Sequence, residues 1–114
     1  MIQIYHKSNC STSLSVLKLI KDAGKKVNII HYLETPLNLE QLQQLLVLLN
    51  VPAENLVRKK EKLFQEKYAH RKLKESDYLK MLVKHPILME RPVVVRGKKA
   101  IIARPIESVI NFIK

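Results

Sequence analysis

Cys10 is the only cysteine of the 114-residue chain, and it stands where an alternating strand pattern gives way to a helical one. The N–H groups and the positive dipole end at a helix N-terminus favour a thiolate over a thiol. The same N–H groups, with the hydroxyls of Ser11, Thr12 and Ser13 beside them, can bind an oxyanion. The sequence therefore indicates the chemistry of a single thiol on an oxyanion, with any resolving thiol supplied by another molecule.

A thiolate that attacks an oxyanion also needs cations that hold the anion and neutralise the developing charge. Guanidinium groups suit this purpose, because their planar forks bind tetrahedral oxyanions in a bidentate manner. Arg58 begins a basic run, and Arg91 and Arg104 each precede a proline. Arg71 and Arg96 match no motif, and we interpret both as surface residues.

The first elements that must position these groups form a strand, a helix and a second strand. Ile2 and Ile4 alternate with polar residues, and apolar residues then recur at helical spacing from Leu14 until Gly24 offers a stop. Residues 27–32 read as a second short strand. This order predicts two parallel strands joined by a right-handed crossover.

A helical region follows. A leucine stripe at 39–49 with Asn38 as a candidate N-cap predicts a helix that Pro52 interrupts. A short turn spans 53–57, and helical spacing returns weakly at 62–69 and clearly at 75–84, where His85-Pro86 ends it. We interpret the leucine stripe as core packing.

The C-terminal part predicts a hairpin and a last helix. Residues 91–95 and 100–103 flank a glycine-containing connection, which is typical of an antiparallel hairpin. Pro105 suits the start of a short helix over 106–113. We therefore expect an α/β fold of the thioredoxin-like type, β-α-β then β-β-α, with a helical insertion between the second and third strands. In that fold the proline before the third strand faces the helix-borne cysteine and is typically cis, and Pro92 takes this place.

The chain is expected to be one domain over residues 1–114. The thioredoxin-like core would comprise residues 1–34 and 86–114, and the helical insert about 37–85.

Several segments resemble the glutaredoxin-dependent arsenate reductases in the same order along the whole chain. They are Tyr5-His6, Cys10-x-Thr12-Ser13, Ile29–Pro36, Leu56–Lys59, His85–Leu88, Arg91–Val95 and Ala103-Arg104-Pro105-x-Glu107. Two departures accompany the match: Ser11 stands where the well-known enzymes carry Gly, and the chain stops at Lys114 without the C-terminal extension of the longer enzymes. We therefore identify the chain as similar to a short form of this family.

The resemblance implies roles for particular residues. Cys10 would be the nucleophile, and His6 a neighbour that helps to lower the thiol pKa. Arg58, Arg91 and Arg104 would grip the oxyanion and the covalent arsenic intermediate. The implied reaction joins Cys10 to arsenate, then glutathione to the arsenic, after which a glutaredoxin removes the mixed thiol and arsenite leaves.

The other arsenate-reductase architecture, which resembles small tyrosine phosphatases, needs Cys-x5-Arg in one anion loop. Val16 stands six positions after Cys10, so the sequence argues against that mechanism. We expect no tightly bound cofactor, with glutathione as a co-substrate. We also expect no metal, because His31, His70 and His85 share no ligand spacing with one another or with Cys10.

Composition bounds the setting. The formal charge is +11, with net +1 over residues 1–57 and net +10 over 58–114, a balance that can draw anions or nucleic acid. The lysines are scattered and the aromatic residues are not interleaved with them, so we expect no nucleic-acid platform. No apolar run approaches the roughly 20 residues that span a bilayer, no signal peptide is visible, and a lone cysteine fits a reducing cytoplasm.

Alternatives remain beside this hypothesis. Cys10 could be a small buried side chain, the three arginines could be surface charges, and His6 could be a polar strand end. The chain could also be a glutathione-dependent thiol reductase acting on an unknown substrate. A third alternative is a regulator of the same fold that binds RNA polymerase, although such regulators sense with Cys-x-x-Cys and Ser13 takes the second position here.

Overall fold

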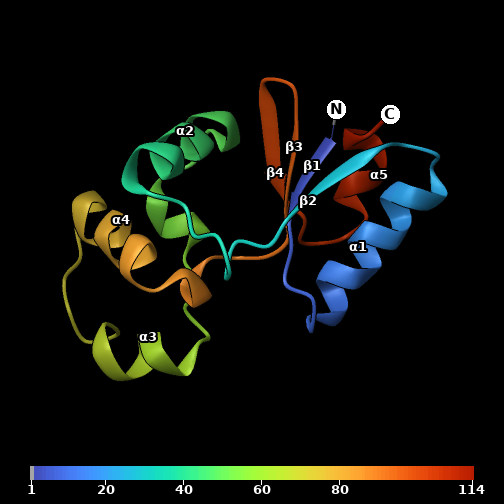
Figure 1. Cartoon of the computed structure of the whole chain (residues 1–114). Helices are drawn as coiled ribbons and strands as arrows, with labels where there is room; N and C mark the ends of the chain where they lie inside the picture. The colour runs from blue at the N-terminus through green and yellow to red at the C-terminus, as the bar shows by residue number, and fades with distance from the viewer. Residues whose placement is uncertain (1) are drawn as a thin grey trace. The chain divides into compact units, whose positions relative to one another are not determined.

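Four short strands form one mixed sheet in a computed structural model that describes residues 2–114. They are β1 (Ile2–Tyr5), β2 (Val27–Ile30), β3 (Val93–Arg96) and β4 (Lys99–Ile102), in the order β2-β1-β3-β4 (Figure 1). β1 and β2 run parallel with Tyr5 opposite Ile30, whereas β3 is antiparallel to both β1 and β4. The parallel pair and the hairpin are the two strand pairings that the sequence predicts.

Two helices cover one face of this sheet. α1 (Ser11–Asp22) joins the parallel strands, α5 (Ser108–Phe112) follows β4, and the two pack side by side (Figure 1). Both helices bury apolar side chains against the strands, because their apolar stripes and the alternate residues of β1 and β3 face each other. The buried core consists of Ile2, Ile4, Val16, Ile20, Val94, Ala103, Val109 and Ile113. The β-α-β and β-β-α halves of the predicted thioredoxin-like fold are confirmed.

The connections around the sheet match the sequence in part. Gly24 follows α1 with φ +74°, and Gly97 occupies the β3–β4 turn with φ +61°, where glycine avoids the cost of a Cβ. The last helix begins at Ser108, two residues later than the predicted start at residue 106. The N–H groups of Ser108, Val109 and Ile110 each bond the carbonyl three residues earlier, so a tighter turn precedes the helix.

Arg96 is not the surface residue that the sequence suggests. It is half-buried, and its Nη1 donates to the carbonyl oxygen of Phe112 at 3.2 Å and also to that of Lys114. Arg96 therefore ties the end of β3 to the end of α5. Arg71 is exposed as predicted, with its guanidinium 5.5 Å from the centre of the Tyr68 ring.

The region between β2 and β3 is helical. It contains α2 (Leu39–Leu49), the 3₁₀ turn η1 (Ala53–Leu56), α3 (Lys62–Lys67), α4 (Glu75–Lys84) and the 3₁₀ turn η2 (Pro86–Leu88). The predicted cap of α2 is confirmed: Asn38 Oδ1 accepts from Gln41 N at 2.8 Å, and Asn38 N donates back to Gln41 Oε1 at 3.0 Å. Asn50, in the left-handed conformation, ends α2 two residues before Pro52.

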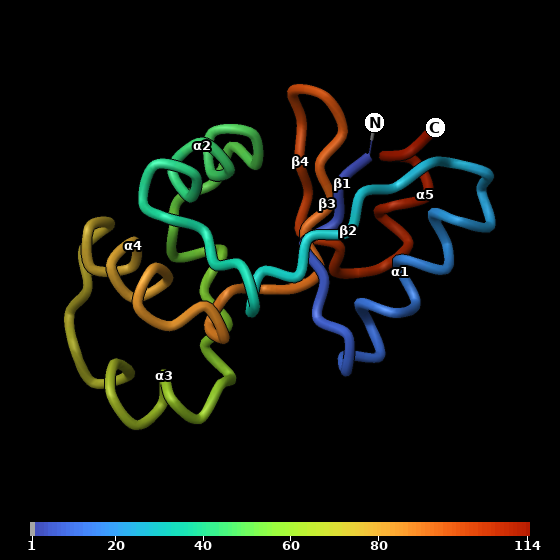
Figure 2. The backbone as a smooth tube through the Cα atoms, in the orientation of Figure 1, coloured from blue at the N-terminus to red at the C-terminus, as the bar shows by residue number. Residues whose placement is uncertain are grey.

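The contacts divide the chain into two compact units, and Figure 2 shows the backbone leaving the sheet after β2 and returning at β3. We call Met1–Thr35 with Arg91–Lys114 the cysteine unit, and Pro36–Glu90 the helical unit. Residues 86–90, which the sequence analysis places in the core, bond within the helical unit, where Glu90 N donates to Leu56 O at 2.7 Å. A single domain over 1–114 stays a prediction.

Candidate active site

Cys10 is the N-cap residue of α1. Its backbone is extended (φ −103°, ψ 120°), its carbonyl accepts from Leu14 N at 3.0 Å, and its own N–H donates to Lys7 O at 3.1 Å. The turn of residues 7–10 thus delivers the half-buried thiol to the first turn of the helix. The sequence predicts this placement from the change of apolar spacing at residue 10.

The surroundings of Cys10 favour the thiolate. Burial acts to raise the pKa of the Cys10 thiol, but it is outweighed by the backbone N–H of Ser13, the Arg91 guanidinium and the backbone N–H of Thr12, so this pKa is lowered. The N–H groups donate to the anion, and the guanidinium adds a hydrogen bond and a positive charge. Cys10 therefore has the features of a reactive cysteine rather than of an inert buried one.

His6 lies directly behind this turn. Its ring is buried, its Nδ1 lies 2.6 Å from Ser13 Oγ, and the same hydroxyl oxygen accepts from Lys7 N at 3.2 Å. Burial, and to a lesser extent electrostatic interaction with His31 and Lys21, lowers the pKa of His6 from its ordinary value and so favours the neutral imidazole. His6 thus reaches the thiol through Ser13, and its influence on the Cys10 pKa stays a prediction.

Arg91 and Arg104 are joined to each other in the cysteine unit. Arg91 is only 6% exposed, and its carbonyl oxygen accepts from Arg104 Nε at 2.8 Å. The Arg91–Pro92 peptide bond is cis, Pro92 is buried, and its carbonyl accepts from Ala103 N at 3.0 Å. The Arg104–Pro105 bond is cis as well. The two hydrogen bonds hold the Arg-Pro pairs together, and the Arg91 guanidinium forms a hydrogen bond with the Cys10 sulfur.

Arg58 belongs to the helical unit. Its N–H donates to Leu88 O at 2.6 Å, its Nε lies 3.6 Å from Glu61 Oε1, and its Nη1 is buried without a hydrogen-bond partner among the described residues. A buried guanidinium N–H that lacks an acceptor is costly, and a bound anion would satisfy it. The described structure thus assembles every predicted site residue except Arg58 within the cysteine unit.

The remaining predicted residues occupy the first turn of α1. Ser11 begins the helix with an exposed side chain, Thr12 is half-buried, and Ser13 is fully buried. Thr12 and Ser13 contribute backbone N–H groups that favour the Cys10 thiolate, and the Ser13 hydroxyl also contacts His6.

His31 is a neighbour that the sequence analysis left without a role. Its ring centre lies 5.9 Å from that of His6 in an edge-on contact. The register of the parallel strands explains this contact. Tyr5 pairs with Ile30, so the residues that follow them, His6 and His31, lie next to each other. The contact could be found once the parallel pairing is assumed.

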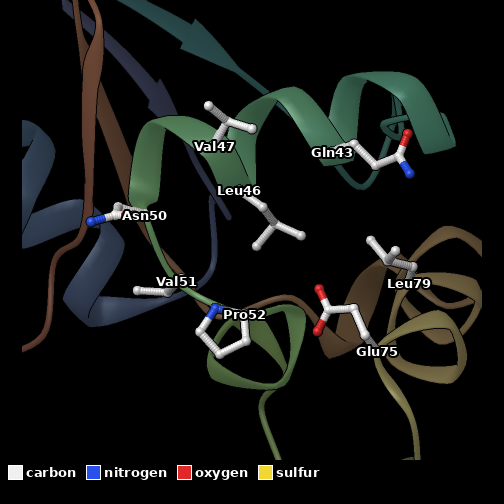
Figure 3. Close-up of a pocket in the computed structure, with 8 residues that line it drawn as sticks. All are labelled: Gln43, Leu46, Val47, Asn50, Val51, Pro52, Glu75 and Leu79. Atoms are coloured by element: carbon white, nitrogen blue, oxygen red, sulfur yellow. The ribbon is translucent and has the colours of Figure 1, made fainter.

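Another cavity is lined by none of these residues. It measures about 630 Å³, belongs to the helical unit and has an open, mainly apolar wall (Figure 3). Leu46 of α2 faces Glu75 and Leu79 of α4 across it, and the Glu75 carboxylate accepts from Ala53 N at 3.1 Å. It holds none of the predicted site residues.

The described residues contain no group of three His, Cys, Asp or Glu side chains that could hold a metal ion. No helix among them is long and apolar enough to cross a bilayer.

Comparison with known proteins shows the family of this chain. The ArsC family model matches residues 5–112. The chain belongs to the ArsC family. It is 34% identical to an arsenate reductase of Escherichia coli, covering 98% of this chain and 80% of that one. It is 40% identical to the uncharacterized protein YfgD of E. coli, over 98% of this chain and 96% of that one.

A solved ArsC-type structure shows the same fold. The arsenate reductase of Vibrio cholerae superposes with a TM-score of 0.90 at 33% sequence identity, covering 96% of this chain and 95% of that one. The thioredoxin-like fold and the membership of the ArsC family, both predicted from the sequence, are therefore confirmed.

Proposed function

We propose that this ArsC-family chain reduces arsenate to arsenite through the Cys10 thiolate, with glutathione and a glutaredoxin as the external thiols. One observation carries the proposal. The N–H groups of Ser13 and Thr12 and the Arg91 guanidinium converge on the single cysteine of the chain and favour its thiolate. The choice of arsenate as the substrate rests on relatives named arsenate reductases, which are 34% and 32% identical to this chain.

The reaction can be written so that atoms and electrons balance. The Cys10 sulfur bonds to arsenic and one arsenate oxygen leaves as water, with arsenic still in the +5 state. Glutathione replaces a second oxygen in the same way. A glutaredoxin thiolate then attacks the glutathione sulfur, the two form a mixed disulfide, and the electron pair of the broken sulfur–arsenic bond reduces arsenic to the +3 state. Hydrolysis releases arsenite and returns the Cys10 thiol.

The residues of the site fit these steps. The N–H groups that favour the thiolate also provide donors for an oxyanion at the helix N-terminus. The Arg91 guanidinium forms a hydrogen bond with the Cys10 sulfur, and Arg104 Nε donates to the Arg91 carbonyl oxygen. We propose that Arg58 completes the anion site, since its buried Nη1 has no acceptor among the described residues and a bound oxyanion would provide one. No second cysteine of this chain can resolve the intermediate; a reducing cytoplasm would supply the thiols.

The test is NADPH-coupled arsenate turnover with glutathione, glutaredoxin and glutathione reductase. We expect no turnover by Cys10→Ser, and a loss of about a hundredfold in kcat by Arg91→Ala, the scale seen when one preorganised donor to a developing anion is removed. Arg58→Ala should lose turnover while its Cys10 thiol keeps the wild-type pKa, because no group of the helical unit is among those that lower it.

Arg71→Ala is the matched control, since Arg71 is an exposed arginine outside the site. It should turn over arsenate at the wild-type rate. Wild-type turnover by Cys10→Ser would refute the proposal.

A thiol reductase acting on another substrate is the second candidate. The Ser11 position favours it, because the resemblance places Gly there in the well-known enzymes. Such an enzyme would need the Cys10 thiolate but not the oxyanion contacts of Arg58 and Arg104. Glutathione-dependent reduction of a model disulfide that survives both arginine-to-alanine changes, with no arsenate turnover in the wild type, would select this candidate.

A further inference from the structure

A second cavity lies beside the turn that carries Cys10. It measures about 250 Å³ and belongs wholly to the cysteine unit. Its lining residues come from the segment after β1 and the segment after β2, namely His6, Lys7, Ser8, Asn9, His31, Leu33 and Glu34. The parallel register of β1 and β2 brings these two segments together.

The cavity wall and the thiol are parts of one hydrogen-bonded network. Lys7 O accepts from Cys10 N at 3.1 Å, and Lys7 N donates to Ser13 Oγ at 3.2 Å. Ser13 Oγ also contacts His6, which forms part of the wall, and the Ser13 N–H is one of the groups that favour the thiolate. A ligand in this cavity would therefore lie next to the segment that holds the reactive sulfur.

The cavity presents both signs of charge. Lys7 is half-buried and Glu34 is exposed, and neither side chain forms an ion pair with the described residues. The carboxylate is carried on a fixed turn, since the N–H groups of Glu34 and Thr35 both donate to His31 O, at 3.0 and 2.9 Å. A ligand with one carboxylate and one ammonium group complements this pair.

An inorganic oxyanion is a poor match, because Glu34 would repel it. The helix N-terminus with Arg91 is the place for the oxyanion, and the cavity is left for a partner of different charge pattern. Its volume is slightly below the roughly 300–1,000 Å³ of drug-sized ligand pockets, so it suits one amino-acid-sized end of a longer molecule.

We propose that this cavity docks the zwitterionic end of the thiol co-substrate, the γ-glutamyl group of glutathione, with its carboxylate on Lys7 and its ammonium on Glu34. The inference rests on the proposed function for the identity of the thiol. It assigns glutathione a recognition site separate from the oxyanion site.

Binding is measured first, without any turnover. S-methylglutathione, which has no free thiol, is titrated into the Cys10→Ser protein by calorimetry. We expect Glu34→Gln and Lys7→Gln each to weaken binding about tenfold, the size expected for the loss of one charge-assisted hydrogen bond. Lys7→Gln keeps the backbone groups that bond Cys10 and Ser13, so the turn is retained. Glu40→Gln and Lys26→Gln, at exposed positions outside the cavity, should bind as Cys10→Ser alone.

Kinetics then separate docking from catalysis. In otherwise wild-type protein, Glu34→Gln should raise the KM for glutathione about tenfold and leave the KM for arsenate and the alkylation rate of Cys10 unchanged. With 2-mercaptoethanol, which carries neither charge, Glu34→Gln and the wild type should be equal.

The two proposals can fail separately. If arsenate is not turned over but S-methylglutathione binds and depends on Lys7 and Glu34, the docking site stands and the proposed reaction falls. If turnover is normal and neither substitution changes the binding of S-methylglutathione, the docking site is refuted. Absence of binding in the millimolar range refutes it as well.

Discussion

At the scale of single residues, the reactivity of Cys10 depends on few neighbours. Burial disfavours the thiolate, and two backbone N–H groups and one side chain, that of Arg91, outweigh it. The N–H groups belong to the helix and stay in any folded variant. Arg91 is therefore the one contribution that a substitution can remove without changing α1.

We predict that Arg91→Ala raises the pKa of the Cys10 thiol, because a hydrogen bond and a positive charge on the thiolate are both lost. The measurement is the rate of alkylation by iodoacetamide across pH. The wild-type inflection should lie below the value of about 8.5 for a free cysteine, and that of Arg91→Ala should move upward.

Arg91→Lys keeps the charge but not the planar fork, so its inflection should fall between the two. Circular dichroism confirms that each variant is folded, which matters because Arg91 is buried. An inflection in Arg91→Ala equal to that of the wild type would show that the helix N–H groups act alone.

His6 gives a second prediction at this scale. Burial and the nearby His31 and Lys21 lower the pKa of His6 from 6.5, so the unfolded chain binds its proton more tightly than the folded one. Its contribution to stability is therefore present above 6.5 and is lost as the pH falls through the lower folded value. His6→Asn, which cannot titrate, should lose less stability on acidification.

The measurement is the urea unfolding midpoint over a series of pH values from about 5 to 7.5, where histidines titrate. The other three histidines are common to both proteins, so the difference between the two curves isolates His6. Parallel curves would contradict the prediction.

At the scale of elements, the termini of the helices decide where the chain turns. α2 is capped by side-chain and backbone bonds between Asn38 and Gln41, and a left-handed Asn50 ends it. The cap satisfies N–H groups that the first turn of any helix leaves unpaired.

We predict that Asn38→Ala lowers the free energy of unfolding by about 1 kcal/mol, because the Gln41 N–H loses its acceptor. Urea unfolding gives this value, and Asn38→Ser, which can still cap, should recover most of it. The cap lies in the helical unit, outside the residues that contact Cys10, so alkylation of Cys10 should be unaffected. A loss in Asn38→Ser as large as in Asn38→Ala would show that the cap does not carry the effect.

At the scale of the whole molecule, the positive charge is concentrated in the cysteine unit. Residues 1–35 and 91–114 carry eleven Lys and Arg against three Asp and Glu, whereas residues 36–90 carry ten against seven. Counting charge over residues 1–57 and 58–114 does not reveal this concentration. The reason is that β3, β4 and α5, from the second half, belong to the same unit as the N-terminal strand. The unit that holds the thiol thus has a field that draws anions.

We predict that Cys10 reacts faster with the anion iodoacetate, relative to neutral iodoacetamide, than free cysteine does. The ratio of the two rates should fall towards that of free cysteine between about 0.01 and 1 M salt, as the screening length shortens from about 30 to 3 Å. Iodoacetamide alone should show little dependence on salt. A ratio that does not change with salt would contradict long-range attraction and leave only the contacts at the sulfur.

Much of the fold and part of the site follow from local patterns. The order of strands and helices, the cap at Asn38, the stop at Gly24 and the helix of residues 75–84 are encoded within a few neighbouring residues. The late start of α5 and the half-buried Arg96 were not predicted, because each depends on hydrogen bonds made after distant segments meet.

The sequence by itself determined that one cysteine begins a helix, that the first two strands run parallel and that two arginines precede prolines. These are matters of spacing and residue type along the chain. Only the tertiary structure decided that the Arg91 guanidinium lies on the Cys10 sulfur, that His6 contacts Ser13 and that a cavity with both signs of charge adjoins the thiol. Residues 81 positions apart can come into contact only when β3 pairs with β1, and the free energy for that pairing comes from the buried core that the whole sheet shares with α1 and α5.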